Sequence, residues 1–152
     1  LPPYSHCQAR SPVATAGRVA IAAANGLAIG WNAELHGMSS LALLAAGATQ
    51  DGGVAVAVIG GHGELFVQQF NDAGGATSEL VNAAPLAAAA ATKAELVIGS
   101  GAAQLVDARG WGEAREAWPS AANALNLPDA FRSLPPKPVY ARAPDARARE
   151  AA

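Results

Sequence analysis

The sequence is poor in cysteine, in charge and in aromatic residues. Its one cysteine, Cys7, has no second cysteine with which to form an internal disulfide or a cysteine-based metal site. Nothing in this usage indicates an oxidising compartment, so we expect a cytoplasmic protein. Charged residues make up 14% of the chain and the net charge is -2. Domains that bind nucleic acid through its phosphates usually carry a clear basic excess, so direct nucleic-acid binding is not expected.

Long hydrophobic runs are also missing. The longest early uncharged stretch, residues 19–33, has 15 residues, whereas a helix needs about 20 apolar residues to span a bilayer. We therefore expect no membrane-spanning segment. Leu1 is not an initiator residue, and residues 1–16 contain three prolines without sustained periodicity. We expect this segment to be irregular. We also expect the chain to be a fragment of a longer protein.

Alanine, by contrast, is abundant. It occupies 40 positions, against 8 aromatic residues, so the core must be built from small side chains. Each small side chain buries little apolar surface, and stability then depends on close packing or on a partner that covers part of the surface. A chain of 152 residues has room for one compact domain with a single core.

The clearest helical pattern covers residues 17–30. Ala22, Gly26 and Gly30 recur every four residues and form a flat stripe of small residues on one face. A glycine inside a helix costs about 1 kcal/mol relative to alanine, so packing against another element or molecule must compensate for Gly26. The pattern predicts a helix suited to close contact.

Beyond this helix the periodicity alternates between strands and helices, which predicts a mixed α/β fold. A hairpin over residues 54–70, with a glycine-rich turn at 60–63, is expected at the centre of the sheet, with Leu65, Val67 and Gln69 on one face. The remaining expected elements are a strand at 33–38, a helix from the N-cap Ser39 to about Ala48, an edge strand at 77–82, a helix at 85–94, a strand at 95–98, a helix at 102–108 and an amphipathic segment at 111–118.

The sequence offers no catalytic constellation. The histidines His6, His36 and His62 are far apart, and none forms a helical pair of metal ligands, so no metal is expected. Cys7 with His36 or His62 could supply a nucleophile and a base, but no triad spacing supports that arrangement. We therefore expect no catalytic residue and no cofactor.

Two glycine-rich turns are candidates for binding an anion. Residues 60–63 lead into a strand, whereas a phosphate loop normally leads into a helix, so a plain hairpin turn is favoured. Gly99, Ser100 and Gly101 join a strand to a helix and form the stronger candidate ligand turn. They lack the full G-x-G-x-x-G pattern and a Walker lysine, so weak or absent ATP binding is expected.

Four separated parts of the chain resemble the TsaB family, a glycoprotease-like, TsaD-related family of the tRNA threonylcarbamoyladenosine pathway. Residues 18–30 followed by 36–41 resemble R-x-G-x-x-x-A-x-G-L-A-x-G and then G-x-S-S-L. Residues 63–66 resemble the end of the family's D-A-R-x-G-E-V-Y hairpin, 97–101 its V-x-G-x-G turn, and 138–144 its closing P-x-Y-x-R segment. The matches follow one another in the family's order.

The resemblance implies the actin-like or ribonuclease H-like α/β fold in two lobes. It implies that residues 17–50 are the remnant of an incomplete first lobe and that 51–142 form the second lobe. Residues 143–152 are expected to be a disordered tail, and residues 1–16 do not match the family.

Two departures accompany the resemblance. The family's G-P-G-S-F-T-G loop should precede Arg18, but residues 10–17 read R-S-P-V-A-T-A-G. Ile59, Gly60 and Gly61 replace the D-A-R triplet, so no role of that triplet is transferred to this chain. We expect an amino-terminally truncated member of the family.

TsaB-like proteins act without catalysis, by dimerising with the enzyme TsaD, which modifies tRNA together with the ATPase TsaE. The resemblance places Arg18, Ala22, Gly26, Ile29 and Gly30 in the partner interface. It implies a non-catalytic scaffold whose partners are TsaD and, through the complex, TsaE, with a homodimer as the alternative assembly. Two rival functions stay open: a glycoprotease-like hydrolase, and a small nucleotide- or ligand-binding module that uses the turn at residues 99–101.

Overall fold

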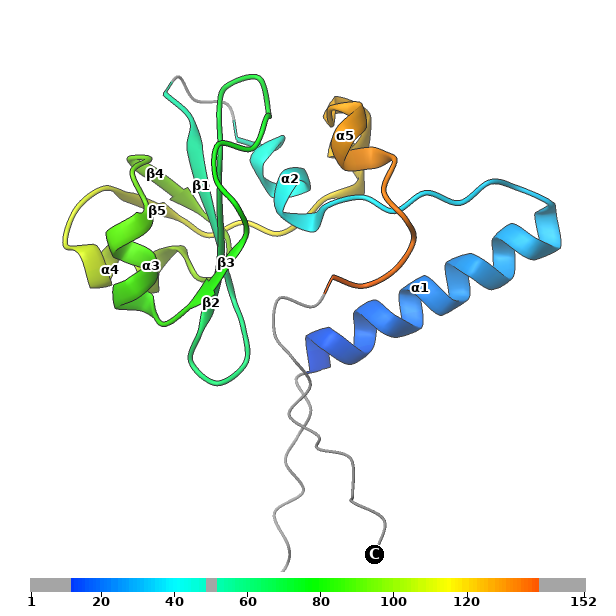
Figure 1. Cartoon of the computed structure of the whole chain (residues 1–152), viewed down its shortest axis with the longest axis horizontal. Helices are drawn as coiled ribbons and strands as arrows, with labels where there is room; N and C mark the ends of the chain where they lie inside the picture. Colours follow the sequence, from blue (N-terminus) through cyan, green and yellow to red (C-terminus); the bar gives the residue numbers. More distant parts are fainter. Residues whose placement is uncertain (1–11, 49–51, 140–152) are drawn as a thin grey trace, which may run out of the picture.

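The computed structural model describes residues 12–48 and 52–139, which contain a five-stranded mixed sheet in the order β3-β2-β1-β4-β5 (Figure 1). The strands are β1 (Val54–Ile59), β2 (Leu65–Phe70), β3 (Val81–Ala83), β4 (Leu96–Ile98) and β5 (Glu113–Arg115). The helices are α1 (Pro12–Trp31), α2 (Ser40–Ala45), α3 (Pro85–Ala91), α4 (Ala102–Arg109), the 3-10 helix η1 (Ala121–Asn126) and α5 (Asp129–Arg132). The predicted mixed α/β class is confirmed.

The predicted hairpin is formed by β1 and β2. The two strands pair antiparallel from Val54 opposite Phe70 to Ile59 opposite Leu65, and the Gly60 amide closes the turn by donating to the Glu64 carbonyl at 2.8 Å. On the other side of β1, strand β4 pairs parallel to it, and β5 pairs parallel to β4. Strand β1 is therefore the central strand, as its continuous apolar run predicts.

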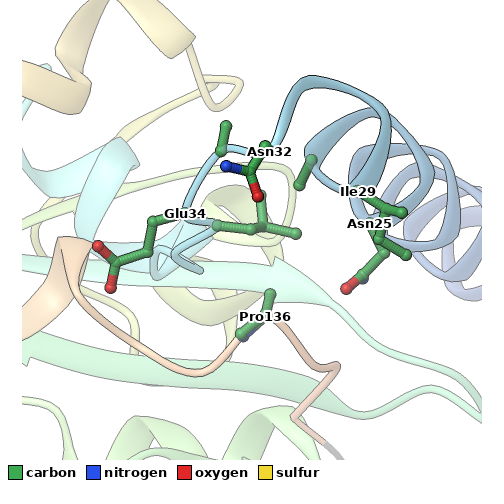
Figure 2. Close-up of a pocket in the computed structure, with 8 residues that line it drawn as sticks. Asn25, Ile29, Asn32, Glu34 and Pro136 are labelled. Atoms are coloured by element: carbon green, nitrogen blue, oxygen red, sulfur yellow. The ribbon is translucent and has the colours of Figure 1, made fainter.

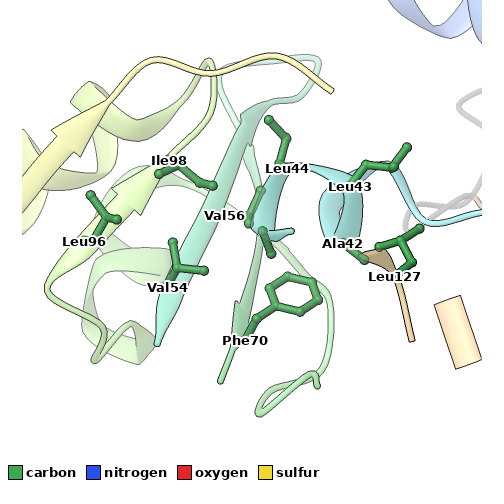
Figure 3. Close-up of a cluster of buried hydrophobic side chains, with 10 residues drawn as sticks. Ala42, Leu43, Leu44, Val54, Val56, Phe70, Leu96, Ile98 and Leu127 are labelled. Atoms are coloured by element: carbon green, nitrogen blue, oxygen red, sulfur yellow. The ribbon is translucent and has the colours of Figure 1, made fainter. Parts of the chain in front are cut away.

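The two faces of the sheet hold two separate clusters of buried side chains. On one face Val54, Val56 and Phe70 pack against α2 (Figure 3). On the other face Ala55 and Ala57 pack beneath α3 and α4. Alternate β1 residues point to opposite faces, so the small alanines all lie on the side where the two helices cover the strand. The predicted small-residue core is thus found beneath these helices.

Most of the expected helices are present. The Ser39 hydroxyl accepts a hydrogen bond from the Ala42 amide at 3.2 Å and caps α2, as predicted. Pro85 lies in the first turn of α3, where its missing N–H has no cost. Helix α4 covers the predicted segment 102–108 and extends to Arg109.

Three strand or segment predictions are corrected. Residues 33–38 form no strand, because within the described part of the chain their strand-like pairing is limited to an isolated bridge between Gly37 and Leu134. The edge strand expected at 77–82 is β3, which begins only at Val81. The reason is that the Gln69 amide donates to the Ser78 hydroxyl at 2.9 Å, so a side chain replaces the carbonyl that a regular ladder would supply.

The amphipathic segment at 111–118 contains β5 rather than a helix. All three β5 side chains are exposed, and the strand is held through its backbone, which pairs in parallel with the buried β4. An amphipathic pattern reports only which side chains meet water. It therefore could not reveal that an unpaired edge of β4 is available to this segment.

Helix α1 lies beside the sheet rather than on it (Figure 1). No residue of the described part of α1 belongs to either core cluster. The helix begins at Pro12, so the prediction of an irregular segment through residue 16 is wrong for its last residues. His6, Cys7 and residues 143–152 lie outside the described part of the chain. None of the described helices is long and apolar enough to cross a membrane.

Candidate functional site

The five residues predicted to form a partner interface all lie on α1. At 100° per residue, Arg18, Ala22, Gly26, Ile29 and Gly30 share one side of the helix. All five are exposed, Ile29 to 83%. The structure therefore brings the predicted residues together on an accessible helix face.

The glycines of this face are open to an approaching element. A Cβ added at Gly26 or Gly30 would meet nothing within 4 Å. The half-buried positions of the helix, Ile21, Ala24 and Ala28, lie on a different side. The small-residue stripe is thus the part of α1 where the backbone of another molecule can approach most closely.

Large apolar side chains are exposed within the stripe and further round the helix. Val19, Leu27 and Trp31 are exposed to 63%, 51% and 72% respectively, and Arg18 is the one charged residue in positions 12–31. A surface helix of a soluble domain normally presents a polar face to water. An exposed apolar helix of this length is typical of an interaction surface.

The carboxyl-terminal end of α1 borders an open cleft of about 610 Å³ (Figure 2). Its lining residues come from the helix end, the segment that follows it and one proline from much later in the chain: Asn25, Ala28, Ile29, Asn32, Ala33, Glu34, Leu35 and Pro136. The Glu34 carboxylate pairs with the Nε2 of His36 at 3.2 Å. This cleft marks the junction between α1 and the rest of the fold.

The candidate ligand turn follows β4 and leads into α4. The Gly99 amide donates to the Arg115 carbonyl at 3.0 Å, and the Gly101 amide donates to the Ala57 carbonyl at 3.0 Å. The Ser100 hydroxyl accepts a hydrogen bond from the Ile59 amide at 3.2 Å. Three polar groups of the turn that could contact a ligand, two backbone amides and one hydroxyl, are therefore already hydrogen-bonded to other parts of the fold.

The glycine at position 99 also has a structural explanation. Gly99 has φ +114, which only glycine adopts readily, and a Cβ there would collide with the Ala57 carbonyl oxygen of β1. Close packing of the turn over the central strand requires this glycine. Its assignment to a ligand site remains a prediction.

No metal-binding constellation is found in the described residues, 12–48 and 52–139, where no three His, Cys, Asp or Glu side chains lie close enough to hold an ion. His36 lies in the segment after α1, whereas His62 lies in the β1–β2 turn. The second open groove, of about 390 Å³, lies between α3 and α4 and is lined by Leu86, Ala89, Ala90, Thr92, Ala108, Arg109 and Trp111.

Arg109 is a residue that sequence reasoning missed. Its guanidinium donates to the carbonyls of Ala94, Glu95 and Trp111 at 2.8, 2.7 and 2.8 Å, and it stacks 3.8 Å from the centre of the Trp111 ring. Desolvation by burial lowers the pKa of Arg109 from its ordinary value, and the Glu95 carboxylate opposes this shift. The side chain ties the end of α4 to the segments before β4 and β5, a role that no local sequence signal indicates.

These observations define a mixed α/β domain with an exposed, small-residue helix at its side. Residues 13–95, from α1 to the residue before β4, match the family model described as TsaD, tRNA N6-adenosine threonylcarbamoyltransferase. The match spans more than half of the chain, so the chain belongs to this family, which relates it to tRNA threonylcarbamoyladenosine modification. The candidate ligand turn lies outside the matched residues. None of the curated proteins compared with the chain matches it.

Proposed function

We propose that the chain is a TsaB-like, non-catalytic subunit of the tRNA-modifying machinery and that α1 is the surface through which it pairs with TsaD. The observation that carries the proposal is the exposure of the α1 stripe, where Gly26 and Gly30 have open space in place of a side chain. TsaE joins only through the resulting complex in this proposal.

The physics of helix packing supports an interface at this position. Two helices normally pack with axes about 8–10 Å apart, and small residues at the contact allow the closest approach. The apolar side chains around the stripe, including Val19 and Ile29, are exposed to water in the isolated chain. Covering them would remove apolar surface from water, which stabilises the complex by about 25 cal/mol per Å² before the entropic cost of association.

The fold is compatible with the same reading. The order β3-β2-β1-β4-β5, with an antiparallel hairpin followed by parallel strands, agrees with the actin-like or ribonuclease H-like fold that the TsaB resemblance implies. The non-catalytic part of the proposal is supported by the sequence, which contains no G-x-S-x-G nucleophile elbow and no H-E-x-x-H zinc motif.

A binding experiment with two matched variants tests the interface. Purified chain is titrated with TsaD from the same organism by calorimetry. Gly26→Arg places a long charged side chain in the stripe, whereas Gly17→Arg places the same side chain on the opposite side of α1, at another exposed glycine where an added Cβ meets nothing within 4 Å. We expect Gly26→Arg to weaken binding by about tenfold or more, about 1.4 kcal/mol, and Gly17→Arg to bind like the wild type. Equal affinities of the two variants would contradict the assigned face.

A second experiment tests the absence of catalysis. The chain alone is incubated with unmodified tRNA and an activated threonylcarbamoyl donor, and in parallel with a glycoprotein substrate. We expect neither modified adenosine nor cleavage products, and we expect stimulation of modification when the chain is added to TsaD and TsaE. Turnover by the chain without TsaD would overturn the scaffold role and favour the transferase or hydrolase reading.

A further inference from the structure

The carboxyl-terminal segment at residues 127–136, here called the strap, is anchored on the core of the domain. Leu127 is 4% exposed and belongs to the cluster on the α2 face of the sheet. Phe131 packs edge-on against Phe70 of β2, with ring centres 5.8 Å apart. The beginning of the strap is thus fixed to the sheet by buried apolar contacts.

The strap then pairs with the linker between α1 and α2, residues 32–39. The Gly37 amide donates to the Leu134 carbonyl at 2.6 Å, and the Leu134 amide donates back to the Gly37 carbonyl at 3.0 Å. The Ser39 amide donates to the Phe131 carbonyl at 2.9 Å. Two segments almost a hundred residues apart in sequence are thereby joined through their backbones.

Glycine is required at the centre of this bridge. A Cβ at position 37 would lie 2.6 Å from the Pro135 carbonyl oxygen and 3.2 Å from that of Leu134. Both obstacles are backbone atoms of the strap, which cannot move aside as a flexible side chain can. Any larger residue must therefore push the strap away from the linker and weaken the paired hydrogen bonds.

The same strap reaches the end of α1. Pro136 lies across the cleft from Asn25 and Ile29 of the helix (Figure 2). Because the described part of α1 contributes nothing to the core clusters of the sheet, the linker and the strap are the parts of the fold that can set its direction.

We propose that the backbone bridge between Gly37 and Leu134 is a latch that holds α1 in one orientation relative to the sheet. The latch presents the small-residue stripe to its partner as a rigid surface, and α1 samples many orientations once the bridge is broken. This inference rests on the proposed function for the identity of the partner, but the orientation of α1 is measurable without one.

The test measures the distance between α1 and the sheet domain in solution. Cys7→Ser removes the native cysteine from the full chain, and nitroxide labels are then attached to cysteines introduced by Ala20→Cys in α1 and Gln104→Cys in α4. The distribution of distances between the two labels is recorded by pulsed electron paramagnetic resonance. Gly37→Ala introduces the obstructed Cβ. Gly61→Ala is the matched control, because a Cβ there meets nothing within 4 Å.

We expect a narrow distribution in the parent chain and in Gly61→Ala, and a distribution broadened by about twofold or more in Gly37→Ala. Leu134→Pro, which removes one donor of the bridge without adding an atom to residue 37, should broaden it in the same way. Protection of the Leu43 and Leu44 amides from hydrogen exchange, unchanged in the variants, shows that the α2 core stays folded. A narrow distribution in both variants would overturn the latch.

Measuring the affinity of the same variants for TsaD distinguishes a failure of the latch proposal from a failure of the proposed function. If the latched orientation is populated about a tenth of the time in Gly37→Ala, the apparent affinity for TsaD falls about tenfold. If the wild-type chain does not bind TsaD, the proposed partner is refuted, while the distance distributions still show whether the latch fixes the orientation of α1. Tight binding by Gly37→Ala with a broadened distribution would refute the claim that the latch matters for the interface.

Discussion

Substituting Arg109 tests how much its side-chain contacts stabilise this small, alanine-rich domain. Arg109→Met keeps most of the aliphatic stem and removes the guanidinium. The substitution leaves the carbonyls of Ala94, Glu95 and Trp111 without their donor and removes the cation from the Trp111 ring. Helix α4 then loses its side-chain connection to the segments that precede β4 and β5.

The size of the loss follows from these contacts. Each hydrogen bond contributes about 0.5–1.5 kcal/mol net, and a partly exposed cation–π contact about 0.5–1 kcal/mol. The bonds to Glu95 and Trp111 are exposed, so water replaces part of what is lost, whereas the bond to Ala94 is partly buried. We therefore expect Arg109→Met to lower the free energy of unfolding by about 2–3 kcal/mol.

Urea denaturation followed by circular dichroism measures this change. Arg115→Met is the control, because Arg115 forms a single exposed ion pair with Glu113 at 2.9 Å, and such pairs are worth about 0–1 kcal/mol. Arg109→Lys should fall between the wild type and Arg109→Met, since lysine keeps the charge but cannot reach three carbonyls with a planar fork. An Arg109→Met variant within about 0.5 kcal/mol of the wild type would refute the reasoning.

Three further outcomes are expected. Leu105→Ala, at a position of α4 that is 0% exposed, should cost about 2–5 kcal/mol in a thermal or urea melt, whereas exposed Leu86→Ala should change stability by less than about 0.5 kcal/mol. Gly99→Ala should destabilise the fold by about 1–3 kcal/mol because it combines a left-handed backbone with a collision against β1, and Gly61→Ala should not. Calorimetry with Mg-ATP should show no micromolar binding, and a micromolar dissociation constant would instead favour a ligand site at the Gly99 turn.

Local patterns in the sequence were enough to predict the elements whose structure depends on their own residues. The apolar run of β1, the glycine turn after it and the alternation of β2 specify a hairpin without further information, and Leu65 and Val67 are buried on the predicted face. Gln69 lies on that face too, and its side-chain amide donates to the carbonyl of Ala91, the last residue of α3, and accepts from the amides of Lys93 and Ala94 just beyond it. Proline near the start of α3 and serine before α2 marked where those helices begin.

The family resemblance placed the candidate interface on one helix, and helical periodicity alone grouped Ala22, Gly26 and Gly30. Periodicity could not show what surrounds that helix in the folded chain. A stripe of small residues has the same spacing whether it packs inside its own chain or faces open space. Only the three-dimensional arrangement shows that added Cβ atoms at Gly26 and Gly30 would meet nothing.

Tertiary structure decided the features that depend on contacts between distant residues. Strand β5 exists because β4 offers an unpaired edge, although the side chains of β5 are all exposed and two of the three are charged. Residues 33–38 remain outside the sheet because, among the residues that the structure describes, their one strand-like bridge is to Leu134. The need for glycine at positions 37 and 99 arises from the backbone of a segment remote in sequence in each case. Steric limits of this kind are set by which backbones cross, and that is a property of the folded chain rather than of any local stretch of residues.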